Sequence, residues 1–213
     1  MGFAFPKVYP ILDSSYIPSI VRTTFLRALA KSLAGAGVTL MEYRNKSGSD
    51  AEILGDTAIL RTAMPTPNIK LILDDRVDLV ERSGFDGVHV DTGDLTPAEA
   101  RRLLGQSRIV GTFGGSDGLV PGILEEPADY FSIGPVYSTS TKQTTKANIG
   151  PEGVRRLREQ AGPGASLVAV GGITLQTAPL ILAAGANTVA VSRAIFRTAD
   201  PAAEFRRWVE ELG

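Results

Sequence analysis

The chain has 213 residues, of which 43% are hydrophobic and 21% are charged, and its net charge is −1. A chain of this length fits one domain with a substantial core, and the near balance of charge argues against a nucleic-acid or membrane-surface role, which would need a basic excess. The absence of cysteine excludes disulfides, thiolate metal sites and cysteine nucleophiles.

Short apolar runs rich in β-branched residues recur along the chain. In order they are KVYPILD (7–13), VTLMEYR (38–44), IKLILDD (69–75), DGVHV (86–90), SRIVGTF (107–113), DYFSIGPVY (129–137), SLVAVGGI (166–173) and NTVAVSRAI (187–195). The runs are continuously apolar rather than alternating, which is typical of parallel strands covered on both faces.

Segments with helical periodicity lie between these runs. They include SIVRTTFLRALAKSLAGAG, DRVDLVERSG, TPAEARRLLG, PEGVRRLREQ and TLQTAPLILAAG, and several end on glycine: Gly37, Gly84, Gly105 and Gly185. Glycine is the usual residue just past a helix C-terminus. Strand and helix alternating eight times predict one α/β domain over 1–213, a (β/α)8 TIM barrel. A doubly wound sheet is the alternative, but it favours a glycine-rich turn after the first strand, and PILDSSY has no glycine.

Polar residues follow the predicted strands, and in a barrel the loops after the strands meet on one face, where catalytic groups gather. The residues at these ends are Glu42, Arg44 and Lys46; Asp74 and Asp75; Asp91 and Asp94; Gly171 and Gly172; and Ser192 and Arg193. Carboxylates hold Mg²⁺ together with substrate phosphate oxygens, and Arg and Lys hold the remaining phosphate oxygens. We therefore expect a polyanionic substrate and a divalent metal.

The segment GPVYSTSTKQTTKANIG (134–150) follows the sixth predicted strand. It contains two serines, four threonines and two lysines, and it has no carboxylate. Hydroxyls and ammonium groups suit an anion, although an ordinary solvated loop has the same composition. A helix that begins just after the Gly171–Gly172 pair would favour phosphate at its N-terminus.

Seven stretches carry a family resemblance: YPILD, EYRNK, LDDRVDL, GVHVDTGDL, ADYFSIGPVYSTSTK, VAVGGIT and VAVSRAIF. With them the chain resembles the thiamine phosphate synthase family, most specifically in GPVYSTSTK, which is close to that family's Gly-Pro-Val-Phe-x-Thr-x-Thr-Lys. The resemblance implies a transferase. In that family 4-amino-5-hydroxymethyl-2-methylpyrimidine pyrophosphate loses pyrophosphate, and the nitrogen of a thiazole phosphate captures the pyrimidine carbon to give thiamine phosphate.

The resemblance also implies roles for individual residues. Arg44, Lys46 and Lys142 would contact pyrophosphate as catalytic groups, and Asp75 and Asp94 would hold Mg²⁺. The residues expected to bind substrate are Glu42, Asp74, Thr112, Thr139, Thr141, Gly172, Ser192 and Arg193. Among these, the hydroxyls of the 134–150 loop and the amides of the last two strand ends would hold the thiazole phosphate.

The chain departs from the family at four of these positions. Glu42 stands where the family has a glutamine that contacts the pyrimidine, and Asp74 stands where it has an asparagine that contacts pyrophosphate. The fifth strand ends in Gly111-Thr112-Phe113 instead of a serine motif, and Arg193 replaces a serine. The departures concentrate on the pyrimidine pyrophosphate side.

Other interpretations remain open for single residues. Asp74 and Asp75 could cap a helix near Arg76, and Asp94 could cap the next helix or sit in a turn. His89 lies within a strand and is interpreted as structural. Trp208, in the last predicted helix, is expected to pack on the barrel exterior.

Two other functions share the motifs. A thiazole tautomerase has the same fold, but its proton-shuttling histidine follows the fifth strand, where TFGGSDG (112–118) has none. A non-catalytic protein that retains the phosphate sites is the second alternative.

The expected surroundings follow from composition. No apolar run approaches the roughly 20 residues of a membrane span, and MGFAFPKVYP lacks the apolar region of a signal peptide. We expect a cytoplasmic protein whose partners are its small-molecule substrates, without nucleic acid or membrane. A homo-oligomer is expected, with a dimer as its form.

Overall fold

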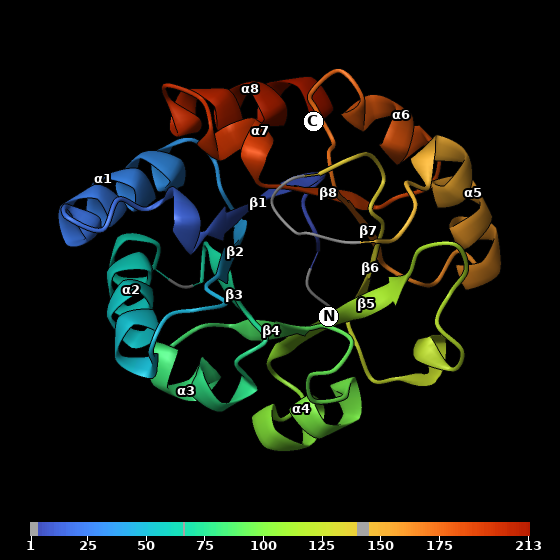
Figure 1. Ribbon diagram of the computed structural model, residues 1–213, viewed down its shortest axis with the longest axis horizontal. Coiled ribbons are helices and arrows are strands. Elements are labelled where there is room, and N and C mark those ends of the chain that lie inside the picture. The colour runs from blue at the N-terminus through green and yellow to red at the C-terminus, as the bar shows by residue number, and fades with distance from the viewer. Residues whose placement is uncertain (1–3, 66, 140–144) are drawn as a thin grey trace.

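A computed structural model describes residues 4–65, 67–139 and 145–213. Eight parallel strands close into a barrel in sequence order, with helices around the outside (Figure 1). The first strand pairs in parallel with both the second and the eighth. This closure confirms the predicted (β/α)8 barrel and excludes the open doubly wound sheet. No helix among the described residues is long and apolar enough to cross a membrane.

The elements have the following bounds. The strands are β1 (Val8–Asp13), β2 (Leu40–Arg44), β3 (Lys70–Asp74), β4 (Gly87–Val90), β5 (Ile109–Gly115), β6 (Tyr130–Ile133), β7 (Leu167–Val170) and β8 (Thr188–Val191). The helices are α1 (Arg22–Gly35), α2 (Asp50–Ala63), α3 (Val80–Ser83), α4 (Pro97–Leu104), α5 (Gly150–Ala161), α6 (Ala178–Ala183), α7 (Arg193–Phe196) and α8 (Pro201–Leu212).

The predicted strand runs all contain a strand, but the last three runs extend too far. The strands β6, β7 and β8 end before Gly134, Gly171 and Ser192 respectively. Gly134 and Gly171 have φ values of 147° and 101°, which turn the chain out of the strand conformation. The apolar residues beyond them form loops over the mouth of the barrel.

The alternation of strand and helix is interrupted once. In the described segment between β5 and β6, the regular helical structure is a single 3₁₀ turn, Ile123–Glu125. Pro121 and Pro127 flank this turn, and Gly118 and Gly122 add backbone freedom, so an α-helix is disfavoured here. After β8 the chain instead forms two helices, α7 and α8.

Two apolar layers hold the barrel. The outer layer lies between strands and helices and includes Trp208, which is fully buried as expected. The inner layer fills the barrel with Tyr9, Leu40, Ile72, Ile109, Tyr130, Val168 and Ala190. Phe5 precedes β1, so it lies at the amino-terminal end of the strands, and its ring packs edge-on against Tyr130 at 5.2 Å. This N-terminal segment closes the floor of the barrel.

A repeated arginine clamp secures the end of the barrel that is opposite the mouth. In each clamp, the guanidinium of a helix arginine donates hydrogen bonds to three backbone carbonyls in the loops that follow. It also binds the side chain of an Asp or Asn that stands just before a later strand. The clamps are Arg61 with Asp86, Arg101 with Asp129, and Arg158 with Asn187. The acceptor side chain also binds a backbone N–H at the start of the preceding strand, as Asp129 does to Val110 at 2.7 Å. One unit is thus used for three pairs of strands: β3–β4, β5–β6 and β7–β8.

Replacing Arg101 with methionine should destabilise the fold and leave the mouth intact. Arg101 is 8% exposed, and its guanidinium binds the carbonyls of Gly105, Arg108 and Pro127. Losing these donors should lower the free energy of unfolding by about 2–4 kcal/mol, measured by urea unfolding.

The neighbouring exposed Arg102→Met variant is the control, and it should change stability by about 0.5 kcal/mol or less. Equal stability of the two variants would contradict the structural role of the clamp.

Candidate active site

A cavity of about 220 Å³ opens at the carboxyl ends of the strands. All eight strands contribute to its lining, including Glu42 of β2, Asp74 of β3, His89 of β4 and Phe113 of β5. Because successive side chains of a strand point to opposite faces, one residue in two along each strand reaches this space. The cavity therefore collects side chains that are far apart in the sequence.

One side of the mouth joins cations to carboxylates. Arg44 Nε and Lys46 Nζ each lie 3.3 Å from Asp74 Oδ2. Arg44 also pairs with Asp13, and Lys46 also pairs with Asp75. The structure thus brings together the predicted residues from the ends of β2 and β3. The cations are pre-oriented by carboxylates at the ends of two strands, β1 and β3.

Beyond these ion pairs, Asp74 and Asp75 each have a buried carboxylate oxygen without a hydrogen-bond donor among the described residues. Burial raises the pKa of Asp74 to about 6, Asp75 adds to the rise, and Lys46 and Arg44 oppose it. Asp74 Oδ2 has its two ion pairs but no well-directed hydrogen bond, and Asp75 Oδ1 is buried without a hydrogen-bond donor in the described part of the chain. Asp75 has a φ of 63°, a left-handed conformation that is uncommon outside glycine.

The capping interpretations of the aspartates are wrong. The 3₁₀ turn after Asp75 has Arg76 at its N-cap position and no side-chain cap. The helix α4 is capped by Thr96, which forms a capping box with Glu99. Asp94 instead accepts a hydrogen bond from the backbone N–H of Asp91 at 2.8 Å, within the loop after β4.

Asp75 and Asp94 suit a hard cation. Burial raises the pKa of Asp94, and the hydrogen bond and charge of Asp75 beside it add to the rise. The two carboxylates thus face one another from separate loops. Among the described residues, no group of three or more His, Asp or Glu side chains could hold a metal. A two-carboxylate site fits Mg²⁺, which keeps several waters and takes further oxygens from substrate phosphates.

The opposite side of the cavity is built from backbone. Tyr137 N–H donates to Gly171 O at 2.9 Å, so the start of the loop after β6 runs beside the Gly171–Gly172 turn. Gly172 has a φ of 64°, and a Cβ there would lie 2.4 Å from the carbonyl oxygen of Ser138. Only glycine allows this approach. The predicted residues that line this side are Thr139, Gly172, Ser192 and Arg193.

Ser192, which follows β8, links the last strand to the first, because its hydroxyl donates to Ile11 O of β1 at 2.7 Å. Its hydroxyl proton is therefore engaged with β1.

Four predicted residues that the structure describes do not line the cavity: Lys46, Asp75, Asp94 and Thr112. Thr112 is buried and alternates along β5 with Gly111 and Phe113, and the residue of this strand end that lines the cavity is Phe113. The Nζ atom of Lys146 lies 3.4 Å from the centroid of the Phe113 ring. Thr141 and Lys142 lie outside the described residues.

Sequence reasoning missed several residues of the cavity. These are Tyr9, Phe113, Ser132 and Lys146, and His89 lines the cavity as well. Tyr9, Phe113 and Ser132 each lie two residues from an inward-facing neighbour, Ile11, Gly111 and Tyr130 respectively, but the apolar runs do not show from the sequence which of the two faces points inward.

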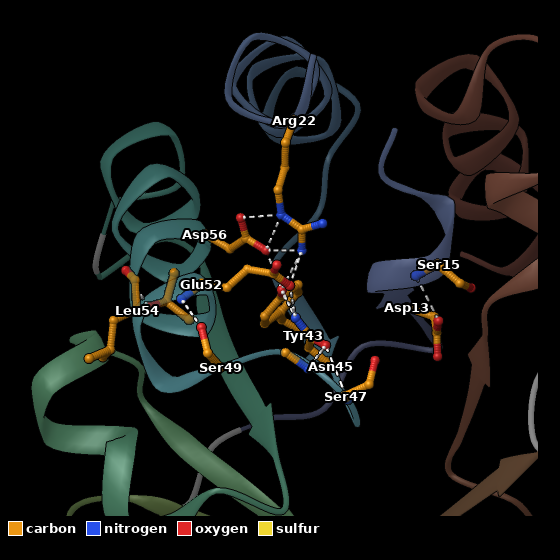
Figure 2. A network of polar contacts seen from close by, with 12 residues as sticks. Asp13, Ser15, Arg22, Tyr43, Asn45, Ser47, Ser49, Glu52, Leu54 and Asp56 are labelled. Carbon is orange, nitrogen blue, oxygen red and sulfur yellow. Dashed lines mark hydrogen bonds and ion pairs between the residues drawn. The ribbon is translucent and has the colours of Figure 1, made fainter. Parts of the chain in front are cut away.

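A second polar network supports the loop that carries Lys46 (Figure 2). Arg22 of α1 donates through Nε to Asp56 Oδ1 at 2.9 Å, and Tyr43 also donates to Asp56. Asn45 Nδ2 donates to Tyr43 at 3.1 Å and to Glu52 at 2.8 Å. The side chains of α1, β2 and α2 thereby form one connected cluster.

Asn45 links this cluster to the loop. Its Oδ1 accepts from the backbone N–H of Gly48 at 2.8 Å, and a Cβ on Gly48 would lie 2.3 Å from Asn45 Nδ2. Ser49 then caps α2 by accepting from Glu52 N–H. The Asn45 side chain thus holds the turn from Asn45 to Ser49 in one conformation. Because Lys46 lies in this turn, its position relative to β2 is set as well.

Known proteins match this chain over most of its length. The family model described as thiamine monophosphate synthase matches residues 8–195. The thiamine-phosphate synthase of Koribacter versatilis is 37% identical over 89% of each chain, and that of Agrobacterium fabrum is 37% identical over 91% of this chain and 90% of the relative. The solved thiamine phosphate pyrophosphorylase of Pyrococcus furiosus is 27% identical, with a TM-score of 0.76 over 97% of this chain and 96% of that one.

Replacing Asp56 with alanine should lower the free energy of unfolding by about 3–5 kcal/mol, because Arg22 and Tyr43 would lose a buried charged partner. Asp56 is 3% exposed. Chemical unfolding measures the loss.

Asp78→Ala is the matched control. Its side chain is 61% exposed and pairs with Arg76, so its loss should cost about 1 kcal/mol or less. If the two aspartates cost the same, the cluster in Figure 2 is no more than a surface ion pair.

Proposed function

Since the chain belongs to the thiamine monophosphate synthase family, we propose that its barrel mouth joins a pyrimidine pyrophosphate to a thiazole phosphate. The family makes the chain a thiamine-phosphate synthase, a transferase of thiamine biosynthesis. The proposal concerns which residues perform this reaction and how.

The observation that carries the proposal is that the two sides of the mouth are built differently. One side has Arg44 and Lys46 beside Asp74 and Asp75. The other side has the backbone turn at Gly172 beside the loop after β6. A charged site with room for a metal suits the pyrophosphate, and a site of amides and hydroxyls suits the single phosphate.

At the pyrophosphate side, Arg44 and Lys46 bind the oxygens of the leaving group, and Asp75 and Asp94 would hold Mg²⁺. When bound, Mg²⁺ would neutralise charge that develops on the pyrophosphate as the C–O bond breaks. The two basic side chains add positioned charge at the same moment. Lys142, predicted to contact the same group, remains part of the proposal without support from the described residues.

At the thiazole side, Thr139 and the backbone of Gly172, Ser192 and Arg193 bind the phosphate. Thr141 is proposed to join them. This places the thiazole nitrogen toward the centre of the cavity, where the pyrimidine methylene carbon becomes electrophilic. The nitrogen attacks that carbon as pyrophosphate departs, so no side-chain nucleophile is needed. The protein supplies position and charge.

Glu42 lies where a pyrimidine would stack into the barrel. It is 4% exposed, and burial together with the nearby Asp74 carboxylate raises its pKa. We infer that the Glu42 carboxyl accepts a hydrogen bond from the amino group of the pyrimidine.

The alternative functions gain no specific support. A thiazole tautomerase would use a histidine after β5, whereas His89 on β4 is the single histidine of the chain. The predicted cytoplasmic location and homodimer remain proposals, and light scattering of the purified protein can test the dimer.

The direct test is to incubate the purified protein with both substrates and Mg²⁺ and to measure thiamine phosphate by chromatography. Product should form with Mg²⁺ and should be lost in EDTA. Absence of product under both conditions would reject the proposal, and undiminished product in EDTA would reject the metal.

Asp74→Asn should raise the Mg²⁺ concentration needed for half-maximal activity roughly tenfold, as expected when a group that supports metal ligands is removed. The reason is that Asp74 joins Asp75 in attracting the cation, whereas asparagine carries no charge. A titration of activity against Mg²⁺ measures this. Higher activity with unchanged Mg²⁺ dependence would mean that Asp74 only repels pyrophosphate.

Thr139→Val should raise the KM for the thiazole phosphate roughly tenfold, the effect of one hydrogen bond to a charged group, with a smaller effect on the pyrimidine substrate. Steady-state kinetics with each substrate varied in turn separates the two. Thr145→Val, an exposed change on the same loop, is the control and should match wild type. If both variants match wild type, the loop is an ordinary solvated one.

A further inference from the structure

At the bottom of the cavity, five polar side chains form a chain of contacts across the inside of the barrel; Tyr9, Glu42, His89 and Ser132 line the cavity, and Tyr130 lies behind them. Tyr9 OH lies 3.4 Å from Glu42 Oε2, and the Tyr130 side chain packs beside Tyr9 in the inner layer, within reach of its hydroxyl. Tyr130 OH lies 3.1 Å from His89 Nδ1, and His89 Nε2 lies 3.5 Å from Ser132 Oγ. The chain runs from β2 through β1 and β6 to β4 and ends again on β6.

All five side chains are shielded from water. Their exposed fractions are 4% for Glu42, 2% for Tyr9, 1% for Tyr130, 8% for His89 and 6% for Ser132. A buried polar group without a partner is costly, so each member needs the next. Room for the chain comes from Gly111, where a Cβ would lie 1.9 Å from Cζ of the Tyr130 ring.

One direction of donation satisfies every member. A carboxylate oxygen can only accept a hydrogen bond, so the Tyr9 hydroxyl is the donor in the hydrogen bond to Glu42. The oxygen of Tyr9 then accepts from Tyr130, whose own oxygen accepts from the Nδ1–H of His89. His89 is left with Nε2 as an acceptor for the Ser132 hydroxyl. The chain therefore also selects the neutral tautomer of His89 with its proton on Nδ1.

The consequence falls on Glu42. One carboxylate oxygen, Oε2, is engaged by Tyr9 on the inner side, and the side chain lines the cavity. With Oε2 held, the remaining oxygen is the one available to a ligand in the cavity. A carboxylate oxygen favours a ligand group that donates and repels one that only accepts.

We propose that Tyr9, Tyr130, His89 and Ser132 are positioning residues that hold Glu42 as a fixed acceptor, so that the enzyme selects a 4-aminopyrimidine over its 4-oxo analogue. This inference rests on the proposed function. The 4-oxo analogue presents a carbonyl oxygen where the substrate presents an amino group. The 4-oxo analogue also carries a proton on the adjacent ring nitrogen and differs in intrinsic reactivity, so the change in their ratio between variants, and not the ratio itself, reports on how Glu42 is held.

The test compares kcat/KM for the aminopyrimidine pyrophosphate and its 4-oxo analogue in wild type and in Tyr9→Phe. Tyr9→Phe should lower the selectivity at least roughly tenfold, mainly through the KM of the amino substrate, and leave the KM of the thiazole phosphate unchanged. Phe5→Leu is the control, because Phe5 packs on Tyr130 but is not one of the five hydrogen-bonding side chains. It should change stability without changing selectivity.

A second background separates positioning from packing. With Glu42→Ala no side-chain acceptor remains at this position, so adding Tyr9→Phe should change selectivity by no more than about twofold, which makes the pair strongly non-additive. An equal effect of Tyr9→Phe in both backgrounds would overturn the proposal.

Ser132→Ala removes the far donor without touching Glu42 or Tyr9, and it serves if Tyr9→Phe does not fold. It should lower selectivity about threefold, and unchanged selectivity in this folded variant would also overturn the proposal. These results are distinct from failure of the proposed function, in which the wild type itself would make no thiamine phosphate.

Discussion

The alternation of side chains along eight parallel strands governs most of what this molecule can do. In a closed barrel each strand sends one residue inward and the next outward, so the inward set must fill a narrow space. Here the lower part of that space holds aromatic and aliphatic groups, with Tyr9 and Tyr130 among them. The upper part holds Glu42, Asp74 and His89. The inward-facing side chains thus change from apolar at the floor to charged at the mouth. The floor is therefore part of the hydrophobic core, and the mouth can bind polar ligands.

Charge at the mouth is balanced before any ligand arrives. Arg44 and Lys46 are each shared between two carboxylates, which holds long side chains in place at partial burial. A phosphate compound must compete with these carboxylates for the cations. A divalent cation held by Asp75 and Asp94, as proposed, would withdraw Asp75 from Lys46, so the metal and the phosphate would favour each other's binding.

The sequence predicted the barrel, its strands and several of the residues that line the mouth, because strand ends and short motifs are local features. It did not predict which face of a strand end points inward: Thr112 was expected at the cavity, and Phe113 is there instead. A one-residue difference reverses the face, and apolar runs without alternation carry no signal to decide it. The chain from Glu42 to Ser132 joins four strands, so it depends on barrel closure and could not be read from any one segment. The 3₁₀ turn between β5 and β6 was missed as well, although the prolines that cause it were visible.

The three arginine clamps lie at the floor, where each fastens the return from a helix into the next strand. No residue of these clamps lines the cavity. Substitutions in the mouth therefore remove none of the clamp contacts that stabilise the scaffold, and the residues of the mouth can change without loss of those contacts. The unusual residues of this chain, Glu42, Phe113 and Arg193, all lie in the part that the clamps leave unconstrained. A barrel fastened in this way can exchange one substrate preference for another by small steps, each of which still yields a folded protein.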